Sequence, residues 1–342
     1  MSSMKDIALA CGVSVATVSK ALNDQPDIGE KTKRMVKKKA EQLGYHPNSV
    51  ARALKTNRSY NLGVLFADAS HSGLTHDYFA SVLESFKEAA EEKGYDITFV
   101  NNNKARNGRM SYLEHVRYRG FDGVVIACVD FTDPEVLELV ESDVPVVTID
   151  HVFNGRIAIL SDNVKGMEQL LSFAYEQGHR KIAYIHGSDS SVTRSRLSSF
   201  YKTAEELGLE IPDEYVCEAA YRDTEAACVA TEALLALPSP PTCILYPDDF
   251  ACFGGLNVML RRGIRVPEDI SVAGYDGLRI GRHVQPRLTT LMQDTEKLGS
   301  YAARELIGLI EKPKTCIPRI IMVEGCVYPG ESLGRVREDE KK

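Results

Sequence analysis

Carboxylate and guanidinium side chains follow many of the short apolar runs between residues 61 and 330. Such groups accept and donate paired hydrogen bonds, which suits a ligand rich in hydroxyl groups. The candidates are Asp68, Asp130, Asp150, Arg194, Arg196, Asp248 and Asp276. Ring faces for the apolar side of such a ligand come from Tyr78, Phe79, His151 and Phe250, in a chain without Trp. The chemistry indicated is reversible binding of a small polar molecule.

Some neighbouring polar residues have simpler structural explanations. Asp249 is expected to cap the helix that follows it, because a carboxylate before a helix accepts a free backbone N–H. Asp162 and Asn163 are expected to hold a turn between two parts of the fold, and His151 has the alternative of an ordinary surface position. These alternatives remain open at the level of the sequence.

The sequence contains none of the motifs that commonly position catalytic groups. Gly-x-x-x-x-Gly-Lys, Gly-x-Gly-x-x-Gly, Gly-x-Ser-x-Gly and His-Glu-x-x-His do not occur, and the eight His do not cluster with a nucleophile. The eight Cys include no Cys-x-x-Cys pair, which favours reduced, buried thiols over zinc ligands or disulfides. An enzyme is therefore disfavoured, and no catalytic residue, metal or cofactor is expected.

The apolar runs also predict the elements that position the polar side chains. Strands are expected at 62–67, 96–100, 123–127, 146–149, 157–160, 181–185, 243–246 and 270–274. Helices are expected between them at 79–93, 109–119, 135–141, 164–177, 194–207, 223–236 and 249–262. Repeated strand–helix units predict an α/β fold with parallel sheets flanked by helices, arranged as two lobes in series. Ligands of open parallel sheets bind beyond the carboxyl ends of the strands, where the candidate residues lie.

Charge is distributed unevenly along the 342 residues. Residues 1–60 contain 11 Lys and Arg against 5 acids, whereas the rest of the chain contains 30 against 43. A basic segment attached to an acidic body indicates that the segment alone meets a polyanion, because the body would repel one.

The basic segment has the pattern of a helix-turn-helix. Two short helices are expected at 5–10 and 14–22, with the corner at 11–13. Ala8 is small where the helices cross, Gly12 permits the positive φ of the turn, and Val18 fills the angle between the helices. A third helix is expected at 30–43, with its lysines on the outer face. Pro47 begins a further segment, 50–55, that is too short to be a stable helix without a partner surface.

Two stretches carry a resemblance to a known family: DIALACGVSVATVSKALN at 6–23 and LGYHPNSVARAL at 43–54. They resemble the DNA-binding head and hinge helix of the LacI/GalR (lactose repressor/galactose repressor) family of transcriptional regulators. Over about 61–330 the chain resembles, more weakly, the periplasmic-binding-protein-like sensor of that family. The resemblance implies a head at 1–46, a hinge helix and linker at 47–60, and an effector-binding and dimerisation domain at 61–342. Lobe one would comprise about 61–161 and 292–319, and lobe two about 162–291 and 320–332, with three crossings between them.

The resemblance also implies which residues meet DNA. The second helix would lie in the major groove, and the paired hinge helices would insert Leu54 into the minor groove to kink the duplex. The residues implied are Ser14, Val15, Ala16, Thr17, Lys20, Asn23, Asn48, Ala51, Leu54 and Lys55. Val15 and Ala16 can only touch apolar groups such as thymine methyls. Lys20 can donate to guanine, although it lacks the rigid fork of an arginine.

For the body, the resemblance places Arg196 and Asp276 at effector-binding positions, with Asp150, Asp248 and Gln293 also lining the ligand site. An effector that favours one arrangement of the lobes would change the spacing of two hinge helices, and hence the affinity for DNA. We therefore expect a sequence-specific repressor whose DNA affinity is controlled by a sugar or sugar derivative. The direction of that control does not follow from the sequence.

Several further expectations concern assembly and location. Residues 330–342 contain no apolar heptad, which favours a homodimer and therefore a pseudo-palindromic DNA operator. A secretory signal, a lipidation motif and a membrane-spanning run are not found, so a cytoplasmic protein without membrane contact is expected. The alternatives are a cytoplasmic sugar-binding protein, a purine-responsive regulator that needs a corepressor, and a structural DNA-bending protein.

Overall fold

The computed structural model describes residues 2–45, 58–67, 73–102 and 109–336. The chain divides into two compact units, Met1–Tyr60 and Asn61–Lys342. The expected hinge segment 47–55 and Asp68 lie outside the described residues, and with them Asn48, Ala51, Leu54 and Lys55.

The first unit contains three helices, α1 (Met4–Cys11), α2 (Val15–Leu22) and α3 (Glu30–Gln42). Gly12 ends α1 with a left-handed φ of 64°, as the turn requires, and Ser14 caps α2 by accepting the N–H of Thr17 at 3.0 Å. The core contains Ile7, Ala8, Val18, Ala21, Val36 and Ala40. The expected helix-turn-helix is therefore present, although Lys33 is buried at 9% exposure and not on the outer face.

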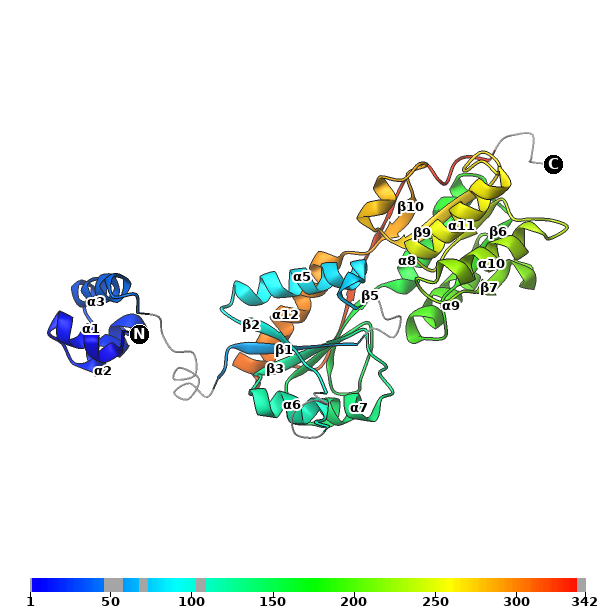
Figure 1. Cartoon of the computed structure of the whole chain (residues 1–342). Helices are drawn as coiled ribbons and strands as arrows, with labels where there is room; N and C mark the ends of the chain where they lie inside the picture. The colour runs from blue at the N-terminus through cyan, green and yellow to red at the C-terminus, as the bar shows by residue number, and fades with distance from the viewer. Residues whose placement is uncertain (1, 46–57, 68–72, 103–108, 337–342) are drawn as a thin grey trace. The chain divides into compact units, whose positions relative to one another are not determined.

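The second unit contains two six-stranded sheets, each covered by helices on both faces (Figure 1). The first sheet has the order β11-β5-β4-β3-β1-β2, and its paired strands are all parallel. Its strands are β1 (Asn61–Phe66), β2 (Asp96–Phe99), β3 (Gly123–Ala127), β4 (Val146–Ile149), β5 (Ile157–Ser161) and β11 (Ile320–Val323). Its helices are α5 (Asp77–Glu91), α6 (Tyr112–Arg119), α7 (Pro134–Glu141) and α12 (Thr295–Glu311), of which α5 packs along α12.

The second sheet has the order β12-β10-β9-β8-β6-β7 and is parallel except for the pair β10–β12. Its strands are β6 (Ile182–His186), β7 (Val216–Glu218), β8 (Cys243–Leu245), β9 (Ser271–Asp276), β10 (Thr289–Met292) and β12 (Cys326–Tyr328). Its helices are α8 (Asn163–Glu176), α9 (Ser191–Glu206), α10 (Thr224–Leu235) and α11 (Asp249–Arg262). One buried cluster lies between the sheet and α8–α9, and another between the sheet and α10–α11. Each lobe is thus a doubly wound α/β unit, as the sequence predicts.

The chain crosses between the lobes after β5, after β10 and after β11. Assigning the strand at 320–323 to lobe two was wrong, because β11 pairs in parallel with β5 at the edge of the first sheet. The last crossing is instead at Glu324–Gly325, just before the short strand β12. Gly325 is required there, since an added Cβ would lie 2.7 Å from the carbonyl oxygen of Met292. Asp162 N–H donates to the Val323 carbonyl at 2.8 Å, so the first and third crossings are bonded to each other.

No helix among the described residues is long and apolar enough to span a membrane.

Candidate functional site

Asp150 lies just beyond the end of β4, in a left-handed conformation with φ of 58°. Its Oδ1 accepts the backbone N–H of Ser161 at 3.1 Å, and its Oδ2 accepts the hydroxyl of Tyr78 at 2.9 Å. Burial raises the pKa of Asp150 above its usual value, and these two bonds and the charge of Arg196 partly oppose the shift. This carboxylate is thus oriented from both sides and lies beside the first crossing.

Asp276 occupies the corresponding place at the end of β9, with φ of 104°. Its Oδ1 accepts the amide of Gln293 at 2.7 Å. Burial raises the pKa of Asp276 to about 7, although the nearby charge of Arg196 opposes this. Gln293, directly after β10, is 6% exposed, and its Oε1 has no partner among the described atoms. A second oriented carboxyl group therefore lies beside the second crossing, next to an amide oxygen that can accept a hydrogen bond.

Arg196 supplies a buried positive charge from α9. Its side chain is 3% exposed, and its guanidinium lies 3.5 Å from the ring centroid of Tyr275. Nε donates to the Oδ1 of Asn163 and Nη1 donates to the carbonyl of Pro247, both at 2.8 Å. Both partners are neutral, so these bonds orient the guanidinium without cancelling its charge. The pKa of Arg196 is raised by the neighbouring tyrosines and Asp276, against the effect of burial, which keeps it cationic.

Asp248 and Asp249 are both buried, but their roles differ from those expected. Asp248, not Asp249, is the N-cap of α11, where its Oδ1 accepts the N–H of Ala251 at 2.8 Å. Asp249 is the first helical residue and accepts the N–H of Leu278 at 2.6 Å and the hydroxyl of Thr290 at 2.7 Å. The expected cap at Asp249 was therefore wrong by one residue. Asp249 fastens α11 to the ends of β9 and β10 instead.

Arg222 is a site residue that the sequence reasoning missed. Its backbone N–H donates to Asp248 at 2.7 Å, and its guanidinium lies 4.0 Å from the ring centroid of Phe250. The same side chain reaches lobe one, 3.7 Å from a carboxylate oxygen of Asp77 and 3.5 Å from the carbonyl of Thr75. The signal was its place after an apolar run, but strand β7 has only three residues and was not recognised.

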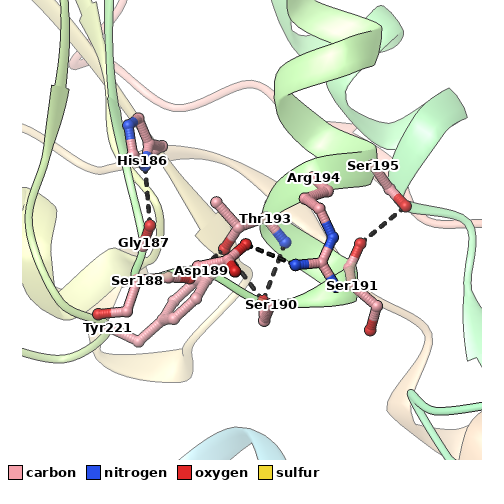
Figure 2. A network of polar contacts seen from close by, with 10 residues as sticks. All are labelled: His186, Gly187, Ser188, Asp189, Ser190, Ser191, Thr193, Arg194, Ser195 and Tyr221. Atoms are coloured by element: carbon pink, nitrogen blue, oxygen red, sulfur yellow. Dashed lines mark hydrogen bonds and ion pairs between the residues drawn. The ribbon is translucent and has the colours of Figure 1, made fainter.

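The loop before α9 forms a separate polar network (Figure 2). Thr193 Oγ1 donates to the carbonyl of Ser188 at 2.7 Å and lies 2.8 Å from the hydroxyl of Tyr221. Arg194 points away from this pair and bonds the carboxylate of Asp189 at 2.6 Å, with 64% of its side chain exposed. The structure therefore does not bring Arg194 into the buried cluster of Arg196.

The remaining candidates of the body divide into aromatic contacts and an exposed turn. The rings of Tyr78 and Phe79 meet edge to face at 4.8 Å between centroids. His151 stacks on Phe131 at 4.1 Å, and burial lowers its pKa. Asp130 is exposed and accepts both the N–H and the hydroxyl of Thr132, which also lowers its pKa. Asp130 thus stabilises its own turn.

In the first unit, the outer face of α2 displays the residues expected to contact DNA. Ser14, Val15, Ala16, Lys20 and Asn23 are exposed, and Thr17 is half-buried. Ser14 also acts as the helix cap, and the side-chain amide of Asn23 donates to the carbonyl of Ser19 at 2.6 Å. A helix with one buried and one small-residue face of this kind can enter a major groove.

These features define a class: a helix-turn-helix unit followed in the chain by a two-lobed body that binds small molecules. The family described as "Bacterial regulatory proteins, lacI family" matches residues 3–48, and "Periplasmic binding protein-like domain" matches residues 171–333. The chain is 30% identical over 325 residues to "Probable HTH-type transcriptional repressor ExuR" of Bacillus subtilis, covering 94% of this chain and 95% of that protein. It is 31% identical over 316 residues to "HTH-type transcriptional repressor PurR" of Pectobacterium atrosepticum, covering 91% of each.

Solved structures agree with this assignment. A complex titled "transcriptional regulator CelR-cellobiose complex" has 25% identity and a TM-score of 0.68, with 97% of this chain and 100% of that chain covered. The lac repressor dimer bound to operator and the anti-inducer ONPF has 23% identity and a TM-score of 0.78, covering 97% and 99%, and shows the fold alone. The chain belongs to the lacI family of bacterial regulatory proteins. It is a DNA-binding transcriptional repressor with an effector-binding body, and not an enzyme.

Proposed function

We propose that the effector of this repressor is a sugar or sugar derivative bound by Asp150, Arg196, Asp276 and Gln293. The observation that carries the proposal is the pair of buried carboxyl groups, each fixed by a hydrogen bond, around a buried guanidinium. Polyhydroxylated ligands are held by acceptors and donors fixed in this way. The cellobiose named with one similar structure and the ribose named with another support a carbohydrate.

Effector binding acts on the crossings between the lobes. Asp150 bonds Ser161 beside the first crossing, and Asp276 bonds Gln293 beside the second. A ligand that bonds these carboxyl groups competes with or reinforces those contacts, so it shifts the preferred lobe arrangement by its differential affinity. Tyr78, Phe79 and Phe250 provide the ring faces, whereas Asp248 serves the site indirectly through the backbone of Arg222.

A purine is the second candidate effector. The edge-to-face pair of Tyr78 and Phe79 offers an aromatic surface on which a flat heterocycle can pack. In that arrangement the carboxyl groups would accept ring N–H groups instead of hydroxyls. The two candidates differ in what they need from Asp276: a sugar gains most from the charged carboxylate as an acceptor of several hydroxyl donors.

The test is a screen of neutral sugars, sugar acids and purines for a change in operator binding and in melting temperature. The variants Asp150→Asn and Asp276→Asn are expected to bind operator but to lose the response to the active compound. Asp130→Asn is the matched control, because Asp130 bonds only within its own turn among the described contacts, and it should respond like the wild type. Equal responses of all three variants would place the effector elsewhere.

We also propose that α2 contacts DNA through Ser14, Val15, Ala16, Thr17, Lys20 and Asn23, in a homodimer that binds a pseudo-palindromic operator in the cytoplasm. Support for this interface comes from the exposure of that face and the family to which the chain belongs. Selection of binding sites from random duplexes at physiological salt, where non-specific binding is weak, should enrich a two-fold symmetric sequence. Enrichment of an asymmetric site would contradict the dimer.

A further inference from the structure

The loop between α2 and α3 contains two carboxylates, and each one pairs with a lysine of a helix. Asp27 bonds the ammonium of Lys20, near the end of α2. Asp24 bonds the ammonium of Lys37, on α3, at 2.6 Å. The two lysine side chains are 50% and 45% exposed, so neither ion pair is imposed by burial. The pairs differ in one respect: only Lys20 lies on the face proposed to contact bases.

Lysine is a poor reader of bases by itself. Its ammonium has three equivalent donors on a flexible chain, whereas arginine presents two parallel donors in a rigid fork. A guanine edge offers two acceptors, N7 and O6, in the major groove. Fixing one of the three lysine donors leaves two, whose directions are then restricted. The bond from Lys20 to Asp27 fixes one donor in this way.

We propose that Asp27 is a specificity-determining positioning residue, which orients Lys20 so that the pair reads a guanine as an arginine fork would. This inference rests on the DNA-reading role proposed above for Lys20. Asp27 also neutralises the lysine when the protein is on non-specific DNA, where a free ammonium would otherwise bind any phosphate. Asp27 therefore favours the correct base over both the wrong base and the backbone. The bond to Lys20 lowers the pKa of Asp27, which keeps the carboxylate charged at neutral pH.

The chain offers a matched control. Asp27→Asn and Asp24→Asn each remove one negative charge from the same loop and each free one lysine, so their long-range effects on DNA affinity are equal. The two variants are compared on the selected operator, on an operator changed at the base pair read by Lys20, and on a scrambled duplex. Lys20→Ala identifies that base pair, because it relaxes the preference there.

Asp27→Asn is expected to lower the preference for the correct base pair by about three- to tenfold, the range of a modest exposed ion pair. It should also raise the affinity for the scrambled duplex. Asp24→Asn should raise the affinity for all three duplexes by a similar factor and leave the preference unchanged. Equal effects of the two variants on the preference would overturn the proposal.

A second background separates orientation from charge. In Lys20→Arg the fork belongs to the side chain itself, so adding Asp27→Asn should leave the base preference intact. A loss of preference in this background as large as in the lysine background would overturn the proposal. If Lys20→Ala changes no base preference, the proposed role of Lys20 fails, and the role of Asp27 fails with it, whereas the effector site is unaffected.

Discussion

The carboxyl group of Asp276 changes its charge in the pH range in which the protein would be assayed. Burial raises its pKa to about 7, so about half of the molecules carry the proton at neutral pH. A sugar hydroxyl donates to the carboxylate but gains less from the protonated form. The affinity for a sugar effector should therefore increase about tenfold from pH 6 to pH 8, following the deprotonated fraction.

Isothermal titration calorimetry across this pH range checks the prediction. The amide in Asp276→Asn does not titrate, so that variant should bind more weakly and with an affinity that is nearly independent of pH. A pH dependence of the same size in Asp276→Asn would assign the titration to another group.

Residue-level prediction succeeded where a side chain directly follows a recognisable strand. Asp150 and Asp276 were found by that rule, and the structure places both at strand ends. The rule failed for Arg222, because β7 is too short to be recognised, and it selected Asp130, which bonds only its own turn among the described contacts. Strand ends locate side chains, but hydrogen bonds to the local backbone decide whether they remain available to a ligand.

At the scale of the element, His179 fastens the segment after β12 to the second lobe. Its Nε2 donates to the carbonyl of Gly334 at 3.1 Å, and its Nδ1 lies 3.0 Å from the hydroxyl oxygen of Thr242. The side chain is 3% exposed, and burial lowers its pKa from 6.5 to about 4. This histidine is thus neutral when folded.

The stability should fall with pH because the unfolded chain binds a proton at His179 more tightly. The contribution is complete above pH 6.5 and is lost between pH 6.5 and about 4, at a cost of about 3 kcal/mol. Urea unfolding of the wild type and of His179→Gln at several pH values measures this as a difference in pH slope. Identical slopes would show that His179 is protonated in the folded protein.

Helix α12 packs against α5 through a glycine. A Cβ added to Gly299 would lie 2.1 Å from the carbonyl oxygen of Val82 and 2.6 Å from the amide nitrogen of Phe86. Gly299→Ala should therefore lower the free energy of unfolding by about 1–3 kcal/mol, because backbone atoms must move. Gly308→Ala is the control in the same helix. Its nearest neighbour would be the Cys316 sulfur at 3.4 Å, so its higher helix propensity should be neutral or stabilising by up to about 1 kcal/mol in thermal unfolding.

At the scale of the whole molecule, an apolar groove on lobe two fits the contact surface of a second copy. It is lined by Phe253, Leu256, Leu260, Ile264, Val266, Val284 and Pro286 among others. Leu260 is 78% exposed, and Arg261 and Arg262 pair with Glu232 beside it, so both signs of charge border the apolar surface. A self-complementary surface of this kind suits a symmetric dimer.

Leu260→Glu is expected to shift the protein from dimer to monomer in sedimentation velocity at micromolar concentration. Operator affinity should fall at least tenfold, since each half-site then binds alone. The melting-temperature response to effector should persist. A dimer of unchanged stability in Leu260→Glu would exclude this groove from the interface.

The sequence predicted the class of fold for the whole molecule because the apolar runs are continuous and regularly spaced. It did not predict correctly where the last crossing lies. The runs at 320–323 and 326–328 are separated by only Glu324 and Gly325, yet they belong to different sheets. Only the pairing of β11 with β5 and of β12 with β10 distinguishes them, and strand pairing is a non-local property.

The placement of α12 and β11 also sets an order of events during synthesis. Lobe one begins at residue 61, but α12 covers α5 and β11 pairs with β5 only after residue 323 has been made. Domains usually fold as they leave the ribosome, the amino-terminal one first. Here the first lobe to emerge is the last whose pieces are all present. Until then its sheet has an unpaired edge at β5, which a nascent chain must protect from other chains.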